Sequence, residues 1–191
     1  MLENLINIDK AIFRFFNLTT ATPIFDLLMP IITNQNIWAI PILILIFFLS
    51  IKGGRKGQIT SVILIIAVSL ADYSSAQVLK PFFERLRPSH EILDGIRILM
   101  GKGGKYGFVS SHAANIYSAA VIFGYFYPKN KKIFFTIAAL VAFSRVYVGV
   151  HYPGDIIFGG ILGYGLAWAT LSLWVIIKMR AIKKGSKWVI Y

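Results

Sequence analysis

The sequence predicts an all-α fold, a polytopic bundle of transmembrane helices that forms a single integral-membrane domain over residues 1–191. Of the 191 residues 57% are hydrophobic, and the mean hydropathy of +0.68 is too high for a soluble globular domain. The apolar residues form long runs, as helices across a bilayer about 30 Å thick require. They do not alternate with polar residues, which argues against a transmembrane β-barrel.

Residues 1–20 predict an amphipathic N-terminal helix that lies on the membrane surface. Their apolar residues follow one helical face, and Glu3, Asp9 and Lys10 lie elsewhere. Alternatively, this segment joins residues 22–33 in a further span, although Asp26 would make such a span costly. We therefore expect five to six spans and favour five.

Five apolar runs predict the confident spans. They cover approximately Ile37–Ile51, Gln58–Leu79, His112–Tyr127, Ile133–Val150 and Ile156–Ile177. Asp72, near the outer end of the second run, predicts a hydrogen bond between helices in preference to a role beside a catalytic base. The last run carries four glycines that favour close helix packing, namely Gly159, Gly160, Gly163 and Gly165.

The net charge of +12 is distributed as membrane topology predicts, and not as a nucleic-acid-binding surface. Three segments hold eleven basic residues and no acidic one: Lys52, Arg55 and Lys56; Lys129, Lys131 and Lys132; and, in the basic tail of residues 178–191, Lys178, Arg180, Lys183, Lys184 and Lys187. The order of spans puts all three segments on one face, which the positive-inside rule makes cytoplasmic. The loop of residues 80–109 and the short connector 151–154 then face outward. We expect a chain integral to the inner (plasma) membrane that interacts with membrane lipids, without nucleic acid or an obligate protein partner.

Three ionisable residues follow one another where the fourth run ends and the fifth begins: Arg145, His151 and Asp155. Such groups are costly beside hydrocarbon unless they have partners or a function. A carboxylate four residues after a histidine, across a Pro-Gly break, can turn back onto the imidazole and fix its tautomer. Arg145 offers a planar fork that suits a phosphate.

Two further segments carry groups that suit an anion. Lys80 and Arg87 each precede a proline, which restricts the backbone around them. Ser110 and Ser111 stand before an apolar helical run, as an N-cap does, and a helix N-terminus with its free N–H groups attracts anions. His112 then lies in the first turn of that helix. The glycine-rich stretch 101–107 lacks a phosphate-loop pattern and predicts a surface loop.

Together these segments supply what phosphoryl transfer needs: cations for the oxygens, a nucleophile and a proton donor. No cluster of acids stands at metal-ligand spacing, so we expect no metal and no cofactor. The three-part pattern Lys80-x6-Arg87-Pro88, Ser110-Ser111-His112 and Ser144-Arg145-x5-His151-x3-Asp155 resembles that of the type-2 phosphatidate phosphatases, membrane lipid phosphatases that share an active-site plan with vanadium haloperoxidases. Ser111 stands where that family usually has glycine.

The resemblance implies that His151 attacks phosphorus to form a phosphohistidine, that Asp155 orients it, and that His112 protonates the leaving oxygen and later helps to activate water. It also implies a phosphate site made of Lys80, Arg87, Ser110, Ser111 and Arg145. The expected substrate is a lipid phosphomonoester or pyrophosphate at the outer (periplasmic) face, such as undecaprenyl pyrophosphate, phosphatidylglycerophosphate, phosphatidate or lipid A 1-phosphate. A lipid phosphotransferase and a non-hydrolytic phosphate or lipid transporter are the alternatives.

Overall fold

The computed structural model describes residues 2–91 and 94–190. The secondary-structure elements in these residues are all helices, joined by turns and loops. The α-helices are α1 (Leu2–Arg14), α2 (Pro23–Thr33), α3 (Gln35–Lys52), α4 (Gly54–Tyr73), α5 (Lys80–Phe83), α6 (Ser111–Phe126), α7 (Lys131–Tyr147) and α8 (Pro153–Lys183). Shorter π and 3₁₀ turns are η1 (Phe15–Thr19), η2 (Ser74–Leu79), η3 (Pro88–His90) and η4 (Pro128–Asn130). The predicted all-α class is confirmed.

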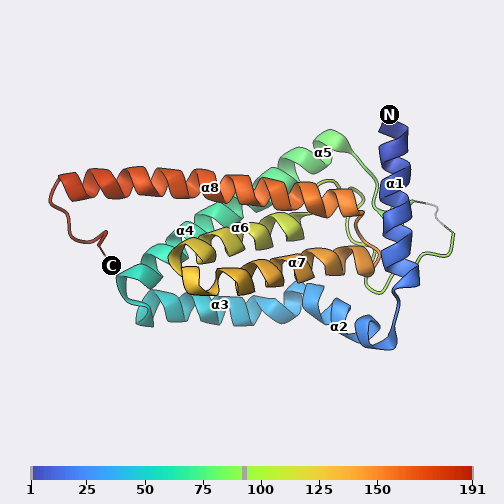
Figure 1. Cartoon of the computed structure of the whole chain (residues 1–191), viewed down its shortest axis with the longest axis horizontal. Helices are drawn as coiled ribbons and strands as arrows, with labels where there is room; N and C mark the ends of the chain where they lie inside the picture. Colours follow the sequence, from blue (N-terminus) through green and yellow to red (C-terminus); the bar gives the residue numbers. More distant parts are fainter. Residues whose placement is uncertain (1, 92–93, 191) are drawn as a thin grey trace.

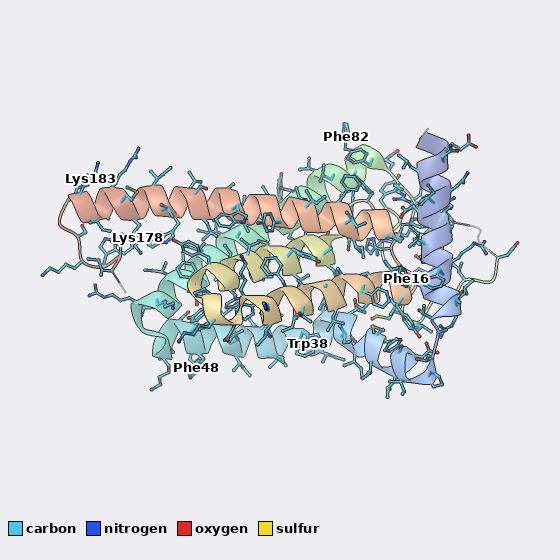
Figure 2. All side chains as sticks on the ribbon, in the orientation of Figure 1. Phe16, Trp38, Phe48, Phe82, Lys178 and Lys183 are labelled. Atoms are coloured by element: carbon cyan, nitrogen blue, oxygen red, sulfur yellow. The ribbon has the colours of Figure 1, made fainter. Side chains whose placement is uncertain are left out.

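The long helices form a bundle, and α1 crosses one end of it (Figure 1). Helix α6 lies inside, packed against α4, α7 and α8. The main core joins residues of α4, α6 and α8, among them Ile63, Ile122 and Leu171. Large apolar side chains cover the outside, as on α3, where none of the residues is buried (Figure 2). An apolar exterior suits contact with lipid.

Three described helices are long and apolar enough to cross a membrane: Gln35–Lys52, the continuous helix Gly54–Phe83, and Pro153–Lys183. The pair Glu3–Thr19 and Pro23–Thr33, bent by 118°, makes a fourth if it counts as one broken span. Helices α6 and α7 have 16 and 17 residues. The expectation of five to six spans therefore stays a prediction. The amphipathic α1 lies across the end of the bundle, as a helix on the membrane surface would (Figure 1).

The glycines of α8 allow close packing against α6. A Cβ on Gly163 would lie 1.9 Å from the carbonyl oxygen of Ala114, and one on Gly159 would lie 2.5 Å from that of Ser110. A Cβ on Gly160 would meet the Tyr117 ring at 3.1 Å. The packing role predicted for these three glycines is confirmed, but it was wrong for Gly165, which faces open space.

Two predicted boundaries shift. The loop expected to begin at residue 80 begins after Phe83, because the helix that starts in α4 continues through η2 into α5. In η2 the Lys80 N–H bonds five residues back, to the Ser75 carbonyl, and this wider turn precedes Pro81, which has no N–H to donate. At the other end, α8 extends to Lys183, so the first part of the expected tail of residues 178–191 is helical.

The three basic segments lie at the same end of the bundle, opposite α1: the α3–α4 turn, the α6–α7 turn and the end of α8 (Figure 1). The last residues fold back there. Val189 is fully buried, and the Arg55 guanidinium donates to the Lys187 carbonyl at 2.8 Å. Asp72 accepts from the Asn115 amide at 2.8 Å, which is the predicted hydrogen bond between helices.

Candidate active site

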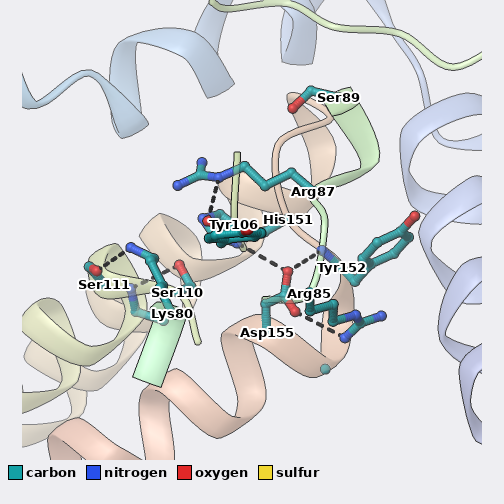
Figure 3. A network of polar contacts seen from close by, with 12 residues as sticks. Lys80, Arg85, Arg87, Ser89, Tyr106, Ser110, Ser111, His151, Tyr152 and Asp155 are labelled. Atoms are coloured by element: carbon teal, nitrogen blue, oxygen red, sulfur yellow. Dashed lines mark hydrogen bonds and ion pairs between the residues drawn. The ribbon is translucent and has the colours of Figure 1, made fainter. Parts of the chain in front are cut away.

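The candidate site lies at the bundle end that α1 crosses, where α7 ends and α6 and α8 begin (Figures 1 and 3). After Tyr147 the chain turns at Gly149, whose φ is +87° and whose Cβ would lie 2.2 Å from the Arg97 carbonyl oxygen, so only glycine fits. Pro153 then starts α8 at a position where its missing N–H is no loss. This sharp connection places His151 and Asp155 beside each other.

His151 and Asp155 form a buried pair. Nδ1 of His151 lies 3.1 Å from Oδ2 of Asp155, and the two side chains are 1% and 0% exposed. The same Oδ2 accepts from the Tyr152 backbone N–H at 3.0 Å, so the carboxylate also caps the start of α8 (Figure 3). Since the carboxylate holds Nδ1, the Nε2 atom remains for an incoming electrophile.

His151 is held in its neutral form. Burial lowers the pKa of His151 well below its ordinary value, and the cations Arg87, Arg145, Lys80 and Arg85 act in the same direction. A neutral imidazole has a lone pair available for attack, so the environment favours a nucleophile or base at this position.

The cations predicted to bind phosphate gather around the two histidines. Arg145, Lys80 and Arg87 all act electrostatically on His112 and on His151. Arg87 and Arg145 are each only 8% exposed. Like charges in a buried space repel one another, so the cluster favours an anionic ligand. The three sequence segments thus meet at one place, as predicted.

Each of these cations is held by a neutral partner. Lys80 donates to the Ser111 hydroxyl at 2.6 Å, and the Arg87 Nε donates to the Tyr106 carbonyl at 3.1 Å (Figure 3). The Arg145 Nη1 donates to the Thr33 hydroxyl at 2.7 Å, while its buried Nε has no hydrogen-bond partner among the described residues. A charged donor that is buried and unpaired is costly, so this atom is available to an acceptor such as a phosphate oxygen.

The serine pair begins α6 as predicted. Ser110 is the N-cap, and its hydroxyl accepts from the Ala113 N–H at 3.5 Å. Ser111, in the first turn, has its hydroxyl between Lys80 and Ser75, which donates to it at 2.9 Å. The free N–H groups and positive dipole end of this helix start therefore lie beside the cation cluster.

The glycine-rich loop is exposed from Gly101 to Lys105 but touches the site at two points. A Cβ on Gly103 would lie 3.0 Å from the Arg87 Nη1, and one on Gly107 would lie 2.9 Å from Oδ2 of Asp155. Glycine at these positions lets the loop pack closely against the charged groups. Sequence reasoning identified a surface loop and missed this packing.

Sequence reasoning also missed Thr33 and Arg85, which contact predicted site residues directly, and Asp9, which contacts Arg85. Arg85 pairs with Asp155 at 2.9 Å and with Asp9 at 2.6 Å. Their partners lie 70 or more residues away along the chain, so no local pattern reveals the contacts. The available signal was a second arginine two residues before Arg87, in the same predicted loop.

The fold and the site together define a helical membrane protein in which three cations surround two histidines at one end of the bundle. The chain belongs to the PAP2 superfamily, whose family model matches residues 58–178. The match covers all three parts of the sequence pattern and confirms the resemblance to the type-2 phosphatidate phosphatases.

Curated relatives are lipid phosphatases by name. The chain is 34% identical over 169 residues to the lipid A 4′-phosphatase of Porphyromonas gingivalis, covering 85% of this chain and 71% of that one. It is 34% identical over 171 residues to the lipid A 4′-phosphatase of Bacteroides thetaiotaomicron, covering 85% and 75%. With the undecaprenyl-diphosphatase of Sulfolobus acidocaldarius the identity is 34% over 143 residues, covering 73% of this chain and 65% of that one.

Solved structures share the fold. The crystal structure of Aquifex aeolicus LpxE superposes with a TM-score of 0.71 at 24% identity, covering 85% of this chain and 93% of that one. The transmembrane PAP2-type phosphatidylglycerolphosphate phosphatase of Bacillus subtilis superposes with a TM-score of 0.66 at 27% identity, covering 89% and 86%.

Proposed function

We propose that this chain is an integral-membrane lipid phosphatase that hydrolyses a lipid phosphomonoester through a phosphohistidine intermediate. The observation that carries the proposal is the buried His151–Asp155 pair at 3.1 Å, surrounded by Lys80, Arg87 and Arg145. A neutral nucleophile next to a cluster of cations suits attack on a phosphate dianion, because the cations neutralise the charge on its oxygens.

In the proposed reaction Nε2 of His151 attacks phosphorus, and the bond to the lipid oxygen breaks in line. Asp155 holds the Nδ1 proton and stabilises the positive charge that forms on the ring. In this proposal His112 is protonated once the phosphate dianion has entered and offsets the surrounding cations. It then gives that proton to the leaving oxygen and takes one from the water that attacks the phosphohistidine, which restores both histidines and releases phosphate. The proposed reaction requires neither a metal nor an organic cofactor.

Lys80, Arg87 and Arg145 are the proposed phosphate ligands, together with Ser110 and Ser111 at the start of α6. The unpaired Nε of Arg145 supports its role, as does the position of Lys80 against the first turn of α6. The Ser110 hydroxyl already caps α6, so Ser110 contributes through the helix start.

The proposed substrate class is lipid A carrying a phosphate on its disaccharide, with the 4′-phosphate as first choice. Its support is the pair of lipid A 4′-phosphatases that align with 85% of this chain. Undecaprenyl diphosphate is the second candidate, supported by the similarity to the Sulfolobus enzyme. Both present a phosphate at the membrane surface while the hydrocarbon stays in the bilayer.

Purified protein in detergent tests the proposal against a panel of bis-phosphorylated lipid A, undecaprenyl diphosphate, phosphatidylglycerophosphate and phosphatidate. A colorimetric assay measures the released phosphate, and mass spectrometry identifies which lipid A phosphate is lost. We expect phosphate release with wild type and a loss of about 10³-fold or more in His151→Gln. Lipid movement without phosphate release would instead indicate a transporter, and product that depends on a second lipid would indicate a phosphotransferase.

We also propose that the site faces the periplasmic side of the inner membrane, because the three basic segments gather at the opposite end of the bundle. The chain has no cysteine, so single-cysteine variants report topology cleanly. In intact cells an impermeant maleimide should label Lys102→Cys and leave Lys129→Cys unlabelled until the membrane is opened. Labelling of Lys129→Cys in intact cells would reverse the orientation.

A further inference from the structure

Asp155 has a second strong partner besides His151. Its Oδ1 accepts from the Arg85 Nη1 at 2.9 Å, while Oδ2 serves His151 and the Tyr152 N–H (Figure 3). Arg85 comes from the loop after α5, two residues before Arg87. The carboxylate is fully buried, so its charge requires compensation within the protein.

Arg85 is in turn held by the N-terminal helix. Its Nη2 pairs with Oδ2 of Asp9 at 2.6 Å, and Oδ1 of Asp9 accepts from the Gly154 N–H at 2.7 Å. Asp9 of α1 therefore bonds both to the arginine and to the first turn of α8. A Cβ on Gly154 would lie 2.9 Å from Oδ2 of Asp9, so the carboxylate fills the space above that turn.

Packing around this ion pair reinforces it. The Arg85 guanidinium lies over the Tyr152 ring at 4.4 Å, and the Phe13 ring of α1 meets Tyr152 edge-on at 5.3 Å. Phe13 and Tyr152 are both fully buried. Helix α1 is thus fixed against the residue that directly follows His151, with apolar contacts on one side of the salt bridge.

The chemistry of the His151–Asp155 pair explains why a further cation is needed beside it. His151 acts in its neutral form, so it cannot balance the charge of Asp155 before attack. If no other cation were present, the buried carboxylate would take up a proton and lose its hold on the imidazole. Both terminal nitrogens of the Arg85 guanidinium are already bound to carboxylates. Arg85 therefore differs from Arg145, whose Nε has no hydrogen-bond partner among the described residues.

We propose that Arg85 and Asp9 are positioning residues: they hold Asp155 ionised and oriented against His151, and so make α1 a part of the catalytic apparatus. This inference rests on the proposed phosphatase function. Arg85 acts through Asp155, and Asp9 acts through Arg85 and the start of α8.

Steady-state kinetics on Arg85→Ala, Arg85→Lys, Asp9→Asn and the Arg85→Ala/Asp9→Asn pair test the assignment. We expect Arg85→Ala to lower kcat about 10²-fold, since small displacements of a catalytic group cost that much. The inhibition constant for inorganic phosphate should stay within about threefold of the wild-type value. Arg85 acts through Asp155 and is not one of the proposed phosphate ligands, so its loss should not weaken phosphate binding. Arg85→Lys should recover part of kcat, and the double variant should lose no more than Arg85→Ala, as residues that act in series do.

Nitrogen-15 NMR of labelled histidine gives a second readout, because the chain has only 3 histidines. The groups that face His151 are Asp155, the cations Lys80, Arg85, Arg87 and Arg145, and His112. Loss of the Arg85 cation should leave Asp155 protonated, weaken its hold on Nδ1 and so alter the signal of the Nδ1–H tautomer of His151. A residue with a purely structural role would not change that signal in a protein that remains folded.

Arg14→Ala is the matched control, since Arg14 also lies on α1 but donates to the exposed Asp94 carbonyl at 3.4 Å. It should keep wild-type kcat. Wild-type kcat in Arg85→Ala, or a rise of tenfold or more in the phosphate inhibition constant with kcat unchanged, overturns the inference. If Arg85→Ala does not fold, Arg85→Lys and Asp9→Asn decide the question by the same measures. Absence of phosphate release in wild type contradicts the proposed function instead, and the NMR readout still tests the contact with His151.

Discussion

Nδ1 of His151 and Oδ2 of Asp155 lie 3.1 Å apart across the start of α8, and neither atom belongs to a side chain that solvent reaches. The contact joins a loop residue to the N3 position of a helix, so the local backbone brings the two side chains together. The same carboxylate caps the helix. The His151–Asp155 pair and the start of α8 therefore share one carboxylate, and a change in either affects the other.

Asp155→Asn should lower kcat about 10²- to 10⁴-fold, as the loss of the carboxylate in a His-Asp pair does elsewhere. The amide cannot stabilise the imidazolium, and Arg85 loses its buried counter-charge. Phosphate release in detergent measures the effect. Asp94→Asn, which changes an exposed carboxylate in the loop after α5, is the control and should stay near wild type. Activity of Asp155→Asn within threefold of wild type would contradict the assignment.

Thr33→Val should weaken phosphate binding, seen as a higher KM and a higher inhibition constant for inorganic phosphate. The Thr33 hydroxyl accepts from the Arg145 Nη1 at 2.7 Å in a buried position. Its removal should also cost about 1–3 kcal/mol of stability, because a buried charged donor loses its partner. Thr170→Val is the control, since the Thr170 hydroxyl bonds only to the Leu166 carbonyl of its own helix. Equal behaviour of the two variants would remove Thr33 from the site.

Gly163→Ala should destabilise the bundle by about 1–3 kcal/mol, the usual cost of overpacking. The added Cβ would lie 1.9 Å from the Ala114 carbonyl oxygen, so α6 and α8 must separate. Gly165→Ala, two residues along the same helix, faces open space and should be neutral or slightly stabilising because alanine favours helix. Thermal unfolding in detergent compares the two. A lower melting temperature for Gly165→Ala than for Gly163→Ala would contradict the packing described for α8.

His151 should remain neutral at pH values below 6.5. Burial, followed by the charges of Arg87 and Arg145, lowers the pKa of His151, so its neutral form persists as the pH falls. The acid limb of kcat/KM that belongs to this group therefore lies below pH 6.5 in the free enzyme. Histidine NMR in the His90→Ala variant locates the midpoint directly, with His151→Gln to assign the signal. A midpoint at or above 6.5 would show that an imidazolium is present at neutral pH.

The residues that sequence reasoning placed correctly were all marked by local features of the sequence. His151 and Asp155 are four residues apart, so spacing alone predicted their contact. Ser110 precedes an apolar run and caps it, as predicted. Arg145 stood out because charge near hydrocarbon needs a reason, whereas Lys80 and Arg87 stood out because each precedes a proline.

The residues that were missed depend on tertiary packing. Thr33 lies 112 residues from Arg145, and Asp9 lies 145 residues from Gly154. In the sequence Asp9 belongs to the polar face of an amphipathic helix, which water or lipid headgroups could equally satisfy. The loop boundary at residue 80 was wrong for a different reason. The apolar run was expected to end at Leu79, whereas the helix continues through the π turn η2 into α5 and includes Lys80.

The contact between Gly163 and Ala114 also decides from which side the bilayer reaches the site. The backbones of α6 and α8 are in contact at this point, so lipid hydrocarbon cannot enter between these two helices. The helices part between α7 and α8, where a groove of about 380 Å³ opens over Tyr117 and begins at Ile156, the neighbour of Asp155. A headgroup bound by the cations can therefore keep its tail in the membrane on that flank, and the substrate need not leave the lipid phase to react.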